Sequence, residues 1–183
     1  MSIADAVAKG EIDVDVQVDT DEETGKLKAS MARMIGAIRA MSSDATLLSK
    51  AAVEGKLSTR ADATKHHGEF RQIVQGVNDT LDAVIGPLNV AAKYVDDISK
   101  GNIPAKITDN YNGDFNSIKN NLNTCVDAVN ALVADSGMLN LAASEGKLAT
   151  RADATKHQGD FRKIVQGVND TLDGVINPIN EVQ

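Results

Sequence analysis

The chain has no tryptophan, three phenylalanines and two tyrosines among its 183 residues. Large rings usually carry much of the area buried in a thick globular core, so their scarcity argues against such a core. Hydrophobic residues still make up 42% of the sequence, which is enough for packed structure rather than disorder. Alanine, valine, leucine, isoleucine and methionine suit thin layers between helices, and we expect an all-α fold.

Other absences exclude whole classes of protein. The single cysteine, Cys125, cannot form an internal disulfide, which favours a reducing compartment. Lysine and arginine form no sustained run and the net charge is −7, so a nucleic-acid partner is not expected. No run of 18 apolar residues exists, and residues 1–11 lack the basic and apolar regions of a signal peptide. We therefore expect no direct membrane insertion of this segment.

What the sequence does contain is a long repeat. Residues 54–89 return as residues 145–180, with 29 identities in 36 positions and an offset of 91. A finer period near 45 lies inside it, because a glycine followed two residues later by an aliphatic residue occurs four times. These pairs are Gly10 and Ile12, Gly55 and Leu57, Gly101 and Ile103, and Gly146 and Leu148. A second glycine follows each first one after 12 to 15 residues, at Gly25, Gly68, Gly113 and Gly159.

The paired glycines predict where helices end and begin again. A glycine directly after a periodic segment is typical of a helix C-terminus, because glycine adopts the left-handed conformation without strain. The polar stretch between the two glycines predicts an extended connector. In the first repeat, residues 12–18 alternate in steps of two, but one short strand has no partner, and we do not expect a strand there.

Beyond each second glycine, apolar residues recur in steps of three and four, which predicts long helices with a wide apolar stripe. Steps of three, four and four break a strict heptad and indicate a stutter. A wide stripe suits a helix that contacts two neighbours in a four-helix bundle. The predicted bundle core consists of Phe70, Ile73, Val77, Leu81, Val84, Phe115, Ile118, Leu122, Val126, Phe161, Ile164, Val168 and Leu172.

Each helix is expected to serve two repeats, since the stripe after Phe70 continues to Ile98. Pro87 and Pro178 fall at two of the junctions, where we expect the helix to kink or to restart with proline in its first turn. No proline marks the junction at 132–137, so the junctions alternate, which accounts for the offset of 91 residues.

A helix ending at Gly-x-aliphatic, a connector of about a dozen residues, and a second helix opened by Gly-x-apolar together resemble the HAMP domain, the linker of bacterial chemoreceptors and sensor kinases. All four repeats match. The family's acidic signature before the second helix is present in the first repeat, from Asp21 to Gly25, but the later repeats have KHHG, NYNG and KHQG instead. The whole chain is similar to the poly-HAMP arrays of some methyl-accepting chemotaxis proteins.

This resemblance implies a parallel homodimer in which each repeat pairs two helices from each chain as a four-helix bundle. The connector would run back along the bundle with its apolar residues in the groove, at Ile12 and Val16, Leu57 and Ala61, Ile103 and Ile107, and Leu148 and Ala152. The implied domains are residues 1–43 (repeat 1, with a truncated first helix), 44–86 (repeat 2), 87–132 (repeat 3) and 133–183 (repeat 4). The short start suggests that the chain is a fragment of a longer receptor.

Candidate chemistry is sparse. His66, His67 and His157 lie beside acids, but a metal site made from His66 and Glu69 would lack ligands, and we expect no metal, cofactor or catalytic residue. The polar residues Asn78, Asp79, Thr80 and Asp82, with their copies from 169 to 173, are read as a mostly solvated face in which Thr80 approaches the core. Cys125 is as consistent with a small core residue as with a reactive one.

Two functional classes remain open. The first is a non-catalytic relay in a bacterial transmembrane chemoreceptor, in which the chemotaxis adaptor and kinase contact other parts of the full protein. The alternative is the linker region of a sensor histidine kinase. Either places this segment in the cytoplasm, attached to a receptor of the inner membrane. A helical solenoid is disfavoured, because solenoid helices are joined by short turns.

Overall fold

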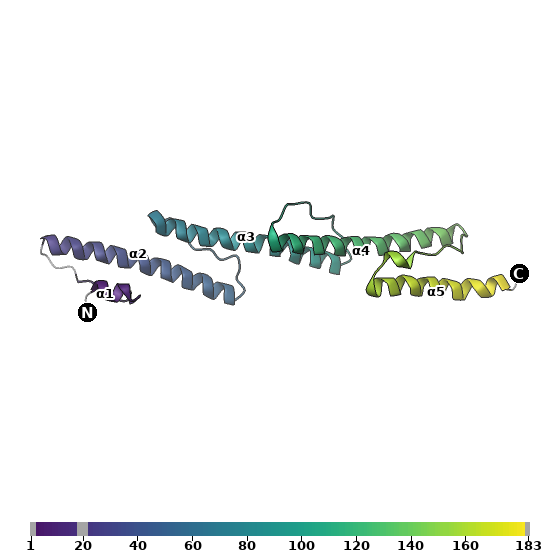
Figure 1. Ribbon diagram of the computed structural model, residues 1–183, viewed down its shortest axis with the longest axis horizontal. Helices are drawn as coiled ribbons and strands as arrows, with labels where there is room; N and C mark the ends of the chain where they lie inside the picture. Colours follow the sequence, from purple (N-terminus) through teal and green to yellow (C-terminus); the bar gives the residue numbers. More distant parts are fainter. Residues whose placement is uncertain (1–2, 18–21, 182–183) are drawn as a thin grey trace. The chain divides into compact units, whose positions relative to one another are not determined.

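The computed structural model describes residues 3–17 and 22–181. Five α-helices follow one another, and the described residues contain no strand (Figure 1). The all-α prediction is therefore confirmed. Asp21 of the acidic signature lies outside the described residues, as does the side chain of Pro178. The helices are α1 (Ile3–Ala8), α2 (Glu22–Val53), α3 (Gly68–Ser99), α4 (Gly113–Ser144) and α5 (Gly159–Glu181), with single 3-10 turns η1 (Ala63–Lys65) and η2 (Ala154–Lys156).

The chain divides into an N-terminal part, Met1–Gly86, and a C-terminal part, Pro87–Gln183. The division falls inside α3, so this helix belongs to both parts. Within each part, the connector lies alongside the helices that precede and follow it. Over the described residues, no helix combines the length and the apolar character needed to cross a membrane.

The helix ends at the first glycines share one hydrogen-bond pattern. Gly55 has φ +72° and its N–H donates to the carbonyl of Ala52, while the N–H of Lys56 reaches back to the carbonyl of Ala51 at 2.8 Å. This pair of bonds is the Schellman motif, which satisfies carbonyls that the end of a helix leaves free. The same two bonds and a positive φ occur at Gly10, Gly101 and Gly146.

The second glycines mark helix starts in three repeats. Gly68, Gly113 and Gly159 are the first residues of α3, α4 and α5, and all three have φ between +53° and +56°. A side chain with a Cβ would be strained in this conformation. Gly25 differs, because α2 already begins at Glu22 and Gly25 lies within its first turn.

Of the two outcomes expected at Pro87, the restart is wrong: α3 runs through this residue without interruption, as the apolar stripe from Phe70 to Ile98 predicts. Proline inside a helix loses one hydrogen bond and costs roughly 3 kcal/mol. The buried Ile85 lies two residues before Pro87, and Pro87 itself lines a small cavity beside the repeat 3 connector. Of residues 12–18, which alternate in sequence, 12–17 form no strand, as expected, and Val18 lies outside the described residues.

The core of repeat 2 lies where the connector meets two helices. Ala61 and Ala63 of the connector and Val74 of α3 form one buried cluster, and Met41 and Leu48 of α2 pack against it. Both buried connector residues of repeat 2 are alanines, whose small side chains suit a thin layer between two helices. The connector is therefore an integral layer of each repeat.

Candidate functional site

A buried asparagine joins the connector to the second helix in repeat 2. Asn78 of α3 is 7% exposed, and its Nδ2 donates to the carbonyl of Ala61 at 2.8 Å. Its Oδ1 accepts from the N–H of Ala61 at 3.1 Å, so one amide satisfies both backbone groups of one residue. An isolated stretch of buried backbone otherwise has no partner for these groups, and leaving them unpaired is costly.

The same asparagine clamp recurs in the C-terminal part. Asn169 bonds both backbone groups of Ala152, at 2.8 and 3.1 Å, and Asn123 bonds those of Ile107, at 3.0 and 2.7 Å. Each asparagine lies ten residues after the second glycine of its repeat. The clamped residue in each repeat is the sixth after the first glycine. We call this pair of hydrogen bonds the Asn clamp.

An ion pair reinforces each Asn clamp. Arg60 of the connector reaches Asp82 of α3 with Nη2 and Nε, at 2.7 and 3.0 Å, and its Nη1 donates to the carbonyls of Leu57 and Thr59. Arg151 and Asp173 repeat this arrangement in repeat 4. In repeat 3, Lys106 lies 2.6 Å from Asp127. The carboxylates are largely exposed, so these pairs contribute less than the buried amides.

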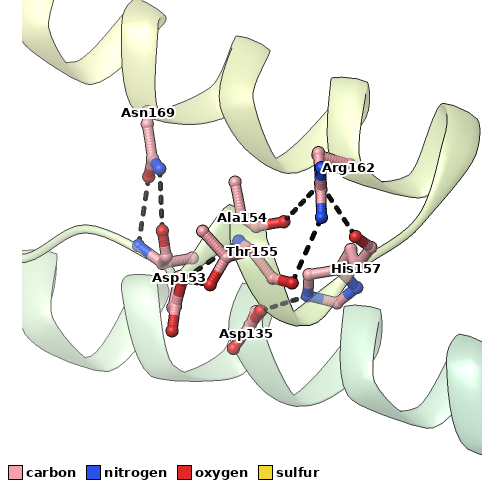
Figure 2. Close-up of polar contacts among 8 residues, drawn as sticks. Asp135, Asp153, Ala154, Thr155, His157, Arg162 and Asn169 are labelled. Carbon is pink, nitrogen blue, oxygen red and sulfur yellow. Dashed lines mark hydrogen bonds and ion pairs between the residues drawn. The ribbon is translucent and has the colours of Figure 1, made fainter.

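A buried histidine joins the connector to the first helix. The Nε2 of His157 lies 2.6 Å from Oδ2 of Asp135 on α4, and the imidazole is 2% exposed (Figure 2). His66 and Asp44 form the same pair in repeat 2, again at 2.6 Å with a 2% exposed imidazole. The connector is thus held by histidine on one side and by asparagine on the other.

Repeat 3 replaces the histidine pair with apolar residues. Val90 of α3 stands at the position of Asp44 and Asp135, and Tyr111 stands at the position of the histidines, two residues before the second glycine. Val90, Tyr111, Pro87 and Ile107 contact one small cavity. The clamped residue also changes, from alanine in repeats 2 and 4 to the larger Ile107.

Repeat 1 uses a third arrangement. Its position for the clamping asparagine holds Ile35, which is 2% exposed. Arg39 of α2 instead donates to the carbonyls of Ile12 and Val14 and lies 3.4 Å from a carboxylate oxygen of Asp13. The basic residue is therefore on the helix and the acid on the connector, the reverse of the other repeats.

The short turns η1 and η2 fix the chain just before each histidine. Asp62 accepts hydrogen bonds from the hydroxyl and the N–H of Thr64, at 2.6 and 3.1 Å, which lowers the pKa of this carboxyl. Asp153 and Thr155 repeat the contacts, and the hydroxyl and N–H of Thr155 lower the pKa of Asp153 in the same way. In repeat 4, Arg162 of α5 also donates to carbonyls of this turn (Figure 2).

Comparison with known families agrees with this arrangement. The model of the HAMP domain family matches residues 65–131 and 156–183, together more than half of the chain. The chain belongs to the HAMP domain family. The two matched segments begin at equivalent positions, Lys65 and Lys156. No solved structure matches the chain. HAMP domains are non-catalytic, cytoplasmic linkers that relay signals within membrane receptors.

The HAMP assignment agrees with the chemistry of the site. Over the described residues, no group of three or more histidine, cysteine, aspartate or glutamate side chains could hold a metal ion. His67 is exposed, and each buried histidine contacts one carboxylate. The contacts of the site hold the connector to the two helices beside it.

The residues of the predicted bundle core differ in how far the single chain buries them. Val126 is buried, and Phe70, Leu81, Phe115, Ile118, Leu122, Phe161 and Leu172 are half-buried. The remaining five, Ile73, Val77, Val84, Ile164 and Val168, are exposed in the single chain. Of the connector residues, Leu57 and Leu148 are exposed, and Ile12 and Ile103 are half-buried.

The clamping residues of these HAMP repeats were not identified from the sequence. Asn78 was read as part of a solvated face and is buried, whereas Thr80 was expected near the core and is exposed. Thr80 donates to the carbonyl of Gly76 in its own helix. The sequence does contain a pattern that indicates these contacts. An asparagine follows the second glycine by ten residues in repeats 2, 3 and 4, and the histidine and its aspartate are both present in repeats 2 and 4 and both absent from repeat 3.

Proposed function

We propose that this chain is the non-catalytic relay segment of a bacterial transmembrane chemoreceptor, working as a parallel homodimer. Input at one end of a helical bundle would become a packing change that passes to a downstream signalling domain. The observation that carries the proposal is the clamped connector between two helices, because it ties the movement of one helix to the next. A packed bundle with two arrangements that differ by a few kcal/mol can act as such a switch.

The unpaired apolar face supports the homodimer. On α3, Val74 packs with Ala61 and Ala63 of the chain's own connector, and Asn78 is buried against Ala61. At 3.6 residues per turn, Ile73 and Val77 lie on the neighbouring edge of the same stripe, where they are 50% and 42% exposed. Contiguous exposed apolar surface of this kind marks an interaction site.

The same face in repeat 4 is hollowed. A cavity of about 290 Å³ lies between α4 and α5, with Leu132, Leu139, Ile164 and Val168 among its lining residues. Side chains from a second chain would fill this space and complete a four-helix bundle. On this proposal the four HAMP domains span residues 1–43, 44–86, 87–132 and 133–183, and adjacent domains share helices α2, α3 and α4.

The relay is tested by cross-linking in the intact receptor. In a variant with Ile73→Cys and Cys125→Ser, oxidation should join two chains at the apolar face and change the output of the receptor by fixing one packing. Asp79→Cys in the same background is the control, since Asp79 is exposed on a polar part of α3. An output that oxidation of the Ile73→Cys variant leaves unchanged, although the cross-link forms, contradicts the relay.

The alternative function is the linker of a sensor histidine kinase. The output assay separates the two. A chemoreceptor should control phosphorylation of a separate kinase and require its adaptor, whereas a sensor kinase should phosphorylate a histidine in its own chain when given ATP. Glutamate- and glutamine-rich methylation heptads after residue 183 would support the chemoreceptor, and an ATP-binding domain would support the kinase.

A further inference from the structure

The connector of repeat 3 ends in a dipeptide that the other repeats lack. Asn112 stands directly before Gly113, the first residue of α4, and Asn-Gly occurs once in the 183 residues. The residue before the second glycine is Thr24 in repeat 1, His67 in repeat 2 and Gln158 in repeat 4. Of these four residues, only asparagine has a side-chain amide that can close a five-membered ring on the next backbone nitrogen.

The structure leaves both reacting groups of this dipeptide free. The side chain of Asn112 is exposed and makes no hydrogen bond at the helix start, although asparagine often caps helices there. The N–H of Gly113 is among the first of α4, which have no carbonyl of their own helix to bond, and it donates to no other group in the described part of the chain. A Cβ placed on Gly113 would meet no atom within 4 Å, so the approach to its nitrogen is also sterically open.

We propose that Asn112 is a site of spontaneous deamidation, which converts it into a mixture of aspartate and isoaspartate. The backbone nitrogen of Gly113 loses its proton to solvent and attacks Cγ of Asn112, and the side-chain nitrogen takes up a proton and leaves as ammonia. The succinimide that forms adds one water molecule and opens at either of its two carbonyls, giving aspartate or isoaspartate. The reaction consumes only water and does not depend on the relay function proposed above.

The asparagines of the Asn clamp are protected from the same reaction. Asn78 and Asn169 are buried, and both polar atoms of each amide bond the backbone of a connector. The next backbone N–H, of Asp79 or Asp170, lies inside a helix, where it bonds the carbonyl four residues earlier. Ring closure at these sites would first have to break both sets of hydrogen bonds. Gln158, the counterpart of Asn112 in repeat 4, would have to close a six-membered ring, which is slower.

Deamidation changes the start of α4 in two ways. Aspartate places a negative charge at the helix N-terminus, where the macrodipole stabilises it. Isoaspartate routes the main chain through the side-chain carbon, which adds one atom to the backbone and moves the end of the connector relative to α4. This connector is attached to α4 through Asn123, whose Oδ1 accepts from the N–H of Ile107 at 2.7 Å. The isoaspartate form should therefore hold the connector less well than the aspartate form.

The site is tested by ageing the intact, folded chain in warm, neutral buffer and mapping it by mass spectrometry. Trypsin releases residues 107–119, which include Asn110, Asn112 and Asn116. Asn112 should gain the mass difference between OH and NH₂, and enzymatic methylation of isoaspartate should label the same peptide. Asn78 and Asn169 should change at least about tenfold more slowly, because each amide must first lose its hydrogen bonds. The rate at Asn112 should rise with pH, since the attacking nitrogen must lose its proton.

Asn112→Gln is the matched control, because it places in repeat 3 the residue found at position 158 of repeat 4. This variant should lose both the mass change and the isoaspartate label in the peptide 107–119. The proposal is overturned if Asn112 stays intact in the aged chain, if it changes no faster than Asn78, or if the label persists in the variant.

Hydrogen exchange at the N–H of Ile107 separates the two products. The Asn112→Asp variant supplies the aspartate form alone, and the aged protein supplies a fraction with isoaspartate. Exchange at Ile107 should be faster in the isoaspartate fraction by about threefold or more, which corresponds to partial loss of one hydrogen bond, while Ala152 should not change. Equal exchange at Ile107 in the two samples overturns the effect assigned to isoaspartate.

Discussion

Removing the Asn clamp of repeat 2 should loosen its connector strongly. Asn78→Ala deletes two hydrogen bonds, to the N–H and to the carbonyl of Ala61, and Ala61 is itself 6% exposed. A buried polar group left without a partner costs about 1–3 kcal/mol, so two such groups cost about 2–4 kcal/mol after partial rehydration. This is a substantial fraction of the roughly 5–15 kcal/mol by which a domain of ordinary size is stable.

The assay is native-state hydrogen exchange together with chemical unfolding. A loss of about 2 kcal/mol accelerates exchange at the amide of Ala61 roughly thirtyfold, and the unfolding midpoint should fall as well. Ala152 provides an internal reference, because its own clamp to Asn169 is intact in the variant. Thr80→Ala is the matched control, since its exposed hydroxyl bonds only within its own helix.

The expected order is therefore a large effect for Asn78→Ala and an effect below about 0.5 kcal/mol for Thr80→Ala. The reasoning is refuted if the two variants change stability equally, since both gain helix propensity on replacement by alanine and the clamp would then contribute nothing beyond that. It is also refuted if exchange at Ala61 does not change, because the amide would then have another partner.

Three further predictions follow from the same contacts. Gly101→Val should lower the free energy of unfolding by about 1–2 kcal/mol or more, because the φ of +81° strains a residue with a side chain, although no atom lies within 4 Å of the added Cβ. Gly76→Ala, inside a helix with equally open space, should stabilise the protein instead. An unchanged thermal melt of Gly101→Val would contradict the assigned helix end. Asp62 and Asp153 have lowered pKa values in the folded state, so their contribution to stability is present above the ordinary carboxyl value of 3.8 and is lost as the pH falls below it. Replacing both with asparagine should therefore make the free energy of unfolding depend less steeply on pH in the acid range. An unchanged pH dependence would argue against the hydrogen bonds assigned to these two carboxylates. Arg60→Met should cost no more than about 1 kcal/mol, because Asp82 is 68% exposed and solvent screens the pair; in denaturant titrations, a loss as large as that of Asn78→Ala would reverse the assigned order.

Backbone features were predictable because they depend on local chemistry. The first glycines could be placed at helix ends because a left-handed residue is needed there, and all four have a positive φ. The continuous helices could be read from apolar residues that recur across the junctions. At Pro87 two signals compete: proline chemistry favours a break, whereas the apolar stripe that continues to Ile98 favours one helix, and the structure has one helix.

The clamps depend on which segments come together, and periodicity does not report this. Asn78 has the same chemistry as a solvated surface residue until a connector lies against it. Asp44 and His66 are 22 residues apart, on different elements, and their proximity follows only once the connector runs back along α2. The internal repeat does contain a signal for this contact, because the same two residue types recur together at Asp135 and His157 and are both absent from repeat 3.

The central claim is that the exposed apolar face of each repeat is covered by a second copy of the chain. In the isolated chain with Cys125→Ser, Ile73→Cys should give a cross-linked dimer on mild oxidation if the chains run parallel and in register, because Ile73 lies on the exposed apolar face.

Sedimentation equilibrium of the unmodified, reduced chain at micromolar concentration is the most direct measurement. The account predicts twice the chain mass of 19.3 kDa, and Ile73→Asp combined with Ile164→Asp should shift the mass toward that of a single chain. A stable species of 19.3 kDa from the unmodified chain would contradict the account.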